Sequence, residues 1–141
     1  KKEFTKILPI LNILGEKIHH IGNFGSGMSV KVLNNFVASC SVLAVRHVLA
    51  EAKNLNISSK QLLNILNCSS GKNWFSDNLN NIDWAKQNYS GNNTIAILEK
   101  DVKSFIDGLE NTESKVSDDM IHFQKALLRG LKNIPRYPGT G

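Results

Sequence analysis

The fold of this chain is decided by one long stretch, residues 26–55, which reads SGMSVKVLNNFVASCSVLAVRHVLAEAKNL. Its apolar side chains recur every three to four residues from Val32 to Leu55, which is the period of an α-helix. At about 1.5 Å per residue, roughly thirty residues span about 45 Å. Apolar positions occur nearly all the way round, so the stretch predicts the buried central helix of a helical domain.

Shorter helices are predicted on both sides of this stretch, and Ser58 with Gln61 forms a capping box in front of one of them. Pro9 is expected to bend or interrupt the first of these helices, residues 4–14. Residues 17–22, Lys-Ile-His-His-Ile-Gly, are predicted to form a short strand that ends at Gly22. The predicted shorter helices cover residues 4–14, 60–67, 94–109 and 116–131. The sequence therefore predicts an all-α fold with one strand-like segment near its start.

Composition places the chain among soluble globular proteins. Of its 141 residues, 41% are hydrophobic and 21% are charged, which excludes collagen-like, rod-like and wholly disordered chains. Two cysteines exclude a disulfide framework. The net charge of +5 permits a nucleic-acid partner, but the basic residues are spread evenly without interleaved aromatics, so we expect none. We also expect no membrane partner, because no uninterrupted apolar run approaches ~18–20 residues.

A glycine-rich loop, residues 22–27, leads into the long helix. Its spacing fits neither a phosphate-binding Walker loop nor a dinucleotide fingerprint. Lys31 and Asn35 follow at i and i+4, so both project from one helix face. An ammonium beside an amide could protonate a developing alkoxide while the amide fixes a substrate hydroxyl or carboxylate. Spacing alone favours the simpler explanation, a flexible loop followed by a solvated lysine.

Other residues that could carry chemistry are weaker signals when taken alone. The pair Lys100-Asp101 lies in an apolar helix and is more often a surface pair than a site. Trp74 follows a turn, so it is either a loop anchor packed on the core or the wall of a pocket. The four histidines lack metal-ligand spacing and the two cysteines lie far apart, so we expect no metal site.

Three blocks of residues occur in an order typical of one enzyme family. The first runs from His20 through the glycine loop to Asn35 and continues with Ala50-Glu51-Ala52; the second is Leu66–Gly71 with Trp74; the third is Lys100-Asp101. Together they resemble the β-hydroxyacid dehydrogenases, and in particular their 3-hydroxyisobutyrate branch. The resemblance covers about residues 5–131, and three blocks at suitable separations are more specific than any one of them.

This resemblance implies the helical C-terminal domain of a 6-phosphogluconate/β-hydroxyacid dehydrogenase-like protein. It implies that Lys31 is the catalytic general acid/base and that Asn35 and Trp74 bind the substrate. Lys100 would reach the cofactor, NAD or NADP, with Asp101 in support. The strand-like segment would then be a remnant of the Rossmann domain that precedes the helical domain in such enzymes.

The same resemblance predicts the domain organisation. Residues 1–24 would be the tail end of the dinucleotide-binding domain, residues 25–133 an all-helical substrate and dimerisation domain, and residues 134–141 a loose tail. The family's Gly-x-Gly-x-x-Gly loop and its Ser-Gly-Gly segment do not occur in this sequence. Asn93 stands where relatives often carry Phe, and Asn34-Asn35-Phe36 differs from the His-Asn-Gly pattern of 6-phosphogluconate dehydrogenases.

We therefore expect a C-terminal fragment of an NAD(P)-dependent oxidoreductase that transfers hydride between nicotinamide and a β-hydroxy acid such as 3-hydroxyisobutyrate. The fragment by itself is expected to be inactive. The alternative is a non-catalytic helical oligomerisation or scaffold module derived from the same fold. We expect a homo-oligomer located in the cytoplasm, or in the mitochondrial matrix if the source is eukaryotic.

Overall fold

The computed structural model describes residues 2–110 and 116–139, except for the side chains of Ile106 and Glu110. This part of the chain contains six α-helices and no strand. They are α1 (Lys2–Leu14), α2 (Ser26–Asn54), α3 (Ser59–Asn67), α4 (Trp74–Asn78), α5 (Thr94–Glu110) and α6 (Asp118–Lys132). The all-α prediction is confirmed. The chain separates into two compact units, residues 1–31 and 32–141.

The first unit contains α1, a loop and the first turns of α2. No residue of α1 is buried, and the helix continues through Pro9, where a bend or an interruption was expected. Pro9 removes one backbone donor from α1, and an exposed helix tolerates that loss because water reaches its backbone. The predicted strand at residues 17–22 is wrong: this segment has no regular structure. A strand needs a neighbouring strand for its backbone hydrogen bonds, and the described residues offer none.

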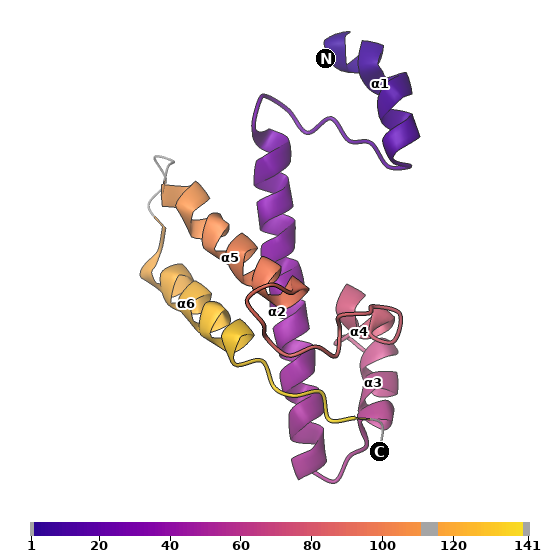
Figure 1. Cartoon of the computed structure of the whole chain (residues 1–141), viewed down its shortest axis with the longest axis vertical. Helices are drawn as coiled ribbons and strands as arrows, with labels where there is room; N and C mark the ends of the chain where they lie inside the picture. Colours follow the sequence, from indigo (N-terminus) through magenta and orange to yellow (C-terminus); the bar gives the residue numbers. More distant parts are fainter. Residues whose placement is uncertain (1, 111–115, 140–141) are drawn as a thin grey trace. The chain divides into compact units, whose positions relative to one another are not determined.

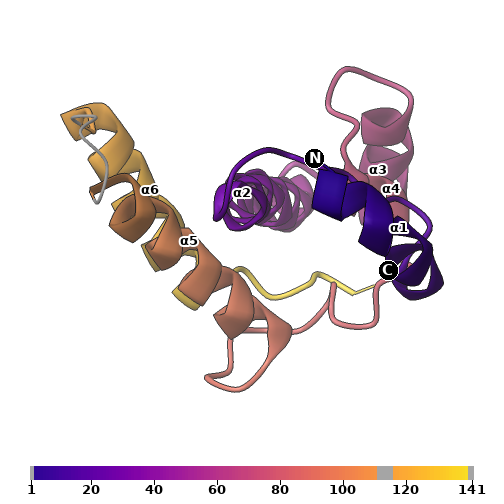
Figure 2. The same ribbon diagram turned by 90° about the horizontal axis from the view of Figure 1, so that it is seen from above.

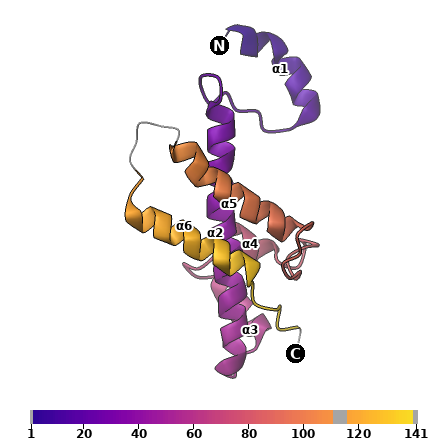
Figure 3. The same ribbon diagram turned by 60° about the vertical axis from the view of Figure 1, so that its left-hand side comes forward.

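The second unit is built around α2. The α5–α6 pair lies on one side of α2, and the α3–α4 pair lies on the other (Figures 1 and 2). A third view shows α5 and α6 side by side as both cross α2 (Figure 3). Hydrogen-bonding side chains start two of the shorter helices: Ser58 accepts from the Gln61 N–H, and Ser117 accepts from the Met120 N–H.

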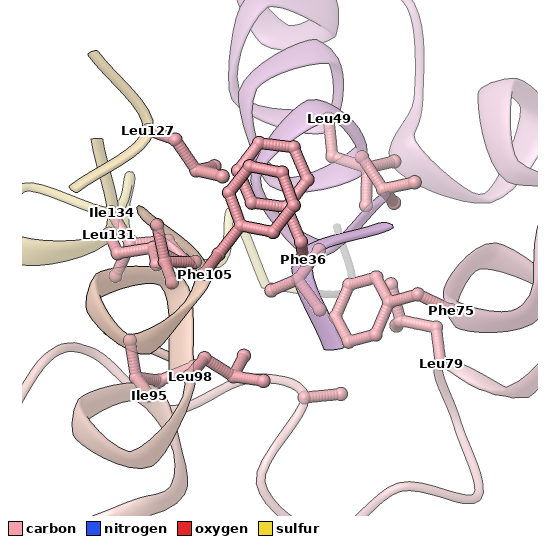
Figure 4. Packing of buried hydrophobic residues seen from close by; sticks show 14 residues of the cluster. Phe36, Leu49, Phe75, Leu79, Ile95, Leu98, Phe105, Leu127, Leu131 and Ile134 are labelled. Atoms are coloured by element: carbon pink, nitrogen blue, oxygen red, sulfur yellow. The ribbon is translucent and has the colours of Figure 1, made fainter. Parts of the chain in front are cut away.

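A group of aromatic side chains fixes α5 and α6 against the N-terminal half of α2. Phe36 of α2 stacks on Phe105 of α5 with ring centroids 4.3 Å apart, and Phe123 of α6 meets Phe36 edge-on at 5.6 Å. Figure 4 shows Phe36 and Phe105 together at the centre of the buried cluster. Further along, α6 approaches α2 so closely that a Cβ on Gly130 would overlap the Leu43 side chain. Ring stacking and a small residue therefore set the spacing of these helices.

A buried arginine ties the centre of α2 to two distant segments. Arg46 is 0% exposed, and its Nη1 donates to the carbonyls of Ala85 and Gln87 at 2.8 Å each, while its Nη2 donates to the carbonyl of Pro135. Burial lowers the pKa of Arg46 from its ordinary value, and Tyr137, whose ring lies 6.0 Å from the guanidinium, acts in the opposite direction. The guanidinium thus donates hydrogen bonds to carbonyls of residues that lie outside the helices.

The segment after α6 is consequently not the loose tail that was expected. Ile134 is buried, Pro135 is bound by Arg46, and Tyr137 packs against the core cluster. The segment runs from the end of α6 towards α3 (Figures 1 and 3). Residues 140–141 of the expected tail lie outside the described part of the chain. The other predicted domain boundaries remain a prediction, although the first compact unit ends at Lys31 rather than at Phe24.

By length and composition alone, α2 is long and apolar enough to cross a membrane, with a mean hydropathy of 1.5 over 18 residues. The sequence expectation considered only uninterrupted apolar runs and therefore missed this property. A single such helix is weak support for a membrane span, because the core helix of a globular domain passes the same test. Only 22% of that window is buried within the chain, so α2 also presents apolar surface to its surroundings.

Candidate functional site

Two residues singled out from the sequence meet where α2 packs against α5. Asn35 Nδ2 donates a hydrogen bond of 2.7 Å to Asp101 Oδ2, across 66 positions of sequence. Asp101 is buried, with 5% of its surface exposed, and Asn35 is half-buried. A hydrogen bond to a charged and buried acceptor is among the stronger ones in proteins. The first and third sequence blocks are therefore joined by one defined contact.

Lys100 stands beside this contact but points outward. Its Nζ lies 3.9 Å from Asp101 Oδ1, and 71% of its side chain is exposed. An ion pair this long and this exposed contributes little to stability. Asp101 is thus held more firmly by Asn35 than by Lys100, while the ammonium of Lys100 remains accessible from solvent.

Lys31 is exposed and is the last residue of the first compact unit. Because α2 is continuous from Ser26 to Asn54, Lys31 precedes Asn35 by one turn of the same helix. This register places both residues on one helix face, as the sequence predicts.

Trp74 is the first residue of α4, which begins at a capping box formed by Asn73 and Ser76. Trp74 is 53% exposed, and its ring centroid lies 6.1 Å from that of Phe75 and 6.3 Å from that of Trp84. Trp74 therefore belongs to an aromatic group on α4 and the following loop. Within the described residues, no hydrogen bond or ring contact joins it to Asn35 or Asp101.

A second polar cluster, which the sequence reasoning missed, lies immediately before Lys100. Glu99 is buried, and its Oε2 accepts a 2.7 Å hydrogen bond from the Tyr89 hydroxyl. Its Oε1 lies 2.8 Å from Lys103 Nζ and 3.5 Å from Lys132 Nζ. Hydrogen bonding from Lys103, followed by that from Tyr89, lowers the pKa of Glu99. Only the Glu99–Lys103 spacing was visible in the sequence, as an i,i+4 pair.

This cluster predicts a pH-dependent effect of the variant Glu99→Gln. A carboxyl group whose pKa is lowered by folding stabilises the native state above its unfolded pKa of about 4.3, and the stabilisation is lost as pH falls through the folded value. We expect Glu99→Gln to lower the melting temperature at neutral pH, and the difference from wild type to shrink below about pH 4. Thermal unfolding followed by circular dichroism from pH 7 to pH 3 measures it. A difference that stays constant across this range would contradict the assignment.

The surface between α2 and α6 carries an apolar groove of about 330 Å³. Its lining residues are Cys40, Leu43, Ala44, His47, Phe123, Ala126 and Leu127. Burial raises the pKa of the Cys40 thiol, which makes it a poor nucleophile. Among the residues that the structure describes, no group of three histidine, cysteine or acidic side chains could hold a metal ion.

Comparison with known proteins assigns the chain to a family. A family model described as "NAD-binding of NADP-dependent 3-hydroxyisobutyrate dehydrogenase" matches residues 25–125. The chain belongs to this family, as the sequence blocks had indicated. No solved structure shows significant similarity to it.

Three of the similar proteins are named as dehydrogenases. Mitochondrial 3-hydroxyisobutyrate dehydrogenase of Rattus norvegicus is 31% identical over 126 residues, which cover 82% of this chain and 36% of the relative. A probable mitochondrial 3-hydroxyisobutyrate dehydrogenase of Arabidopsis thaliana is 31% identical over 67% of this chain and 29% of the relative. For 2-(hydroxymethyl)glutarate dehydrogenase of Eubacterium barkeri, 30% identity extends over 50% of this chain and 24% of the relative. The chain thus spans about a third of the length of the rat and plant relatives.

Proposed function

We propose that this chain is the helical part of an NAD(P)-dependent dehydrogenase that acts on a β-hydroxy acid such as 3-hydroxyisobutyrate. The observation that carries the proposal is the hydrogen bond between Asn35 and Asp101. It brings together the two sequence blocks that resemble the catalytic and cofactor-contacting parts of the family. The activity is attributed to a longer protein that includes this chain, because the matched relatives are about three times as long.

The exposed end of Lys100 fits a dinucleotide cofactor. A lysine ammonium is a compact point charge on a flexible stem and suits a phosphate-bearing ligand. The side chain of Lys100 is 71% exposed. Its Nζ lies 3.9 Å from Asp101 Oδ1, which limits the movement of the ammonium. Lys100 would hold NAD or NADP from the helical side, with Asp101 in support. When bound, the nicotinamide supplies or accepts the hydride.

The proton is handled by Lys31 in this proposal. During oxidation Nζ accepts the proton of the substrate hydroxyl, and during reduction it returns a proton to the same oxygen. Asn35, one turn later on α2, orients the reacting group. Trp74 supplies an apolar wall for the substrate, and its exposed ring is compatible with contact to a small molecule.

A second function is favoured by the apolar surface of α2. Leu33 is 49% exposed, Val37 is 64% exposed, and Phe123 of α6 is 49% exposed beside the groove. Such a surface suits association with another protein, so a non-catalytic helical scaffold is the competing proposal. A homo-oligomer is compatible with both functions. The rat and plant relatives are named as mitochondrial, which supports mitochondria as a second candidate location besides the cytoplasm.

Assays of the longer protein with a panel of hydroxy acids distinguish the two functions. The panel contains 3-hydroxyisobutyrate, 2-(hydroxymethyl)glutarate and a 2-hydroxy acid as control, each with NAD and with NADP. The dehydrogenase proposal predicts reduction of one nucleotide by a β-hydroxy acid and none by the 2-hydroxy acid. Absence of turnover with the whole panel, together with a stable oligomer in sedimentation, would favour the scaffold.

A further inference from the structure

We propose that Asp101 is a positioning residue that holds the Asn35 amide so that its second N–H donates to the hydroxyl oxygen of the substrate, and not to the carboxylate. This inference rests on the proposed function, which gives Asn35 a substrate to hold. Asp101 acts through Asn35, because it is 5% exposed and its Oδ2 already accepts from Asn35 Nδ2.

The contact with Asp101 fixes which end of the amide faces α5. An ionised carboxylate has acceptors and no donor, so the nitrogen of Asn35 must face Asp101 Oδ2, 2.7 Å away. Rotating the amide by half a turn would bring Oδ1 against a carboxylate oxygen with no proton between them. Burial of Asp101 increases the penalty for that arrangement. Asn35 is therefore held in one of its two amide orientations.

The held amide has one N–H left to offer. Its Oδ1 accepts from Asn34 Nδ2 at 3.4 Å, a long and exposed hydrogen bond that adds little. The second Nδ2–H is the amide donor left for a ligand, and the side chain is half-buried rather than enclosed. An N–H in this position stabilises negative charge that develops on an oxygen as its proton departs.

Charge and register together select the substrate hydroxyl as the acceptor. A substrate carboxylate at Asn35 Nδ2 would bring a second full negative charge close to Asp101, whereas a hydroxyl binds there as a neutral group. Lys31 precedes Asn35 by one turn of α2, so a hydroxyl that gives its proton to Lys31 lies within reach of the Asn35 amide. The spacing in the sequence had left hydroxyl and carboxylate equally open.

A reciprocal exchange of the two residues tests the pairing and its direction. Asn35→Asp places two carboxylates against each other and is expected to lower the melting temperature by roughly 5–10 °C. The double variant Asn35→Asp with Asp101→Asn keeps the net charge and should recover most of that loss. Its kcat/KM should nevertheless stay about 10–100-fold below wild type, because position 35 no longer carries a donor. Asn54→Asp is the matched control: Asn54 lies on the same helix and donates to Glu51 Oε2 at 2.9 Å, but it is exposed.

Inhibition by isobutyrate, which has the carboxylate but lacks the hydroxyl, identifies the group that Asn35 binds. We expect Asn35→Ala to lower kcat/KM for 3-hydroxyisobutyrate by about 10–100-fold and to leave the isobutyrate inhibition constant unchanged within about twofold. Inhibition that weakens in parallel with kcat/KM would overturn the inference, since Asn35 would then hold the carboxylate.

Two further outcomes would also overturn it. A double variant as unstable as Asn35→Asp would mean that the two side chains do not form the pair. A double variant that recovers activity as well as stability would mean that Asn35 does not donate to the substrate. The melting temperatures test the pair even if the wild-type protein oxidises no hydroxy acid, so failure of the proposed function is seen separately.

Discussion

Replacing Arg46 with methionine is expected to lower the free energy of unfolding by about 3–5 kcal/mol. The guanidinium donates to the carbonyls of Ala85, Gln87 and Pro135 from a fully buried position on α2. Methionine fills much of the same space but donates nothing, so three carbonyls lose a charged partner at once. A loss of this size is a large share of the ~5–15 kcal/mol that stabilises an ordinary domain. Urea unfolding followed by circular dichroism measures it.

Two further variants make the Arg46 result specific. Lys125→Met removes an exposed cation from α6 and should change the free energy of unfolding by no more than about 0.5 kcal/mol. Arg46→Lys keeps the charge but has no planar fork to reach three carbonyls, so its loss should fall between the two. An Arg46→Met variant within about 1 kcal/mol of wild type would show that water or other groups satisfy these carbonyls.

Replacing Lys31 with alanine is expected to lower kcat of the longer enzyme by about 10²–10⁴-fold, with a smaller change in KM. The proposed role of Lys31 is proton transfer in the transition state, and a group that acts mainly there contributes to kcat more than to ground-state binding. Steady-state oxidation of 3-hydroxyisobutyrate at saturating nucleotide separates the two parameters.

Lys53→Ala is the matched control for this prediction. Lys53 is an exposed lysine on the same helix, close to the opposite end of α2. Its removal should leave kcat within about twofold of wild type, and both variants should melt within a few degrees of the parent because both lysines are exposed. Loss of kcat in both variants to the same extent would point to a general effect of charge rather than to proton transfer by Lys31.

The sequence was most informative where a regular period or a cap determines the structure. The apolar repeat from Val32 onward predicts a helix to Leu55, and α2 ends at Asn54. Ser58 caps α3 as its spacing to Gln61 indicates. These features depend on neighbours three or four positions away, so they can be read from a short window of sequence.

Contacts between distant segments could not be predicted in this way. Arg46 lies on the helix that the apolar period predicts. Its three carbonyl partners belong to residues outside the helices, and no sequence pattern marks a backbone carbonyl as available to a distant side chain. For the same reason the segment after α6 appears loose when only its prolines and glycines are considered. The predicted strand failed because strand formation depends on a partner, whereas a helix closes its own hydrogen bonds.

The candidate site was predictable only in part. Resemblance to the family indicated Asn35 and Asp101 as site residues. The hydrogen bond between them depends on the packing of α5 on α2, which the sequence does not show. Glu99, the neighbour of Lys100, gave no signal beyond one charge pair, because its contacts with Tyr89 and Lys132 span separate elements. The roles of Lys31, Trp74 and Lys100 remain predictions that the variants above examine.

Chemical rescue of the Lys31→Ala variant tests the central claim most directly. A small primary amine such as ethylamine can enter the space left by the lysine side chain and take the substrate proton in its place. If Lys31 is the general acid/base, kcat of the variant should rise with amine concentration, while the wild-type enzyme and Lys53→Ala do not respond. A Lys31→Ala enzyme that oxidises 3-hydroxyisobutyrate at the wild-type rate, with or without amine, would contradict the account.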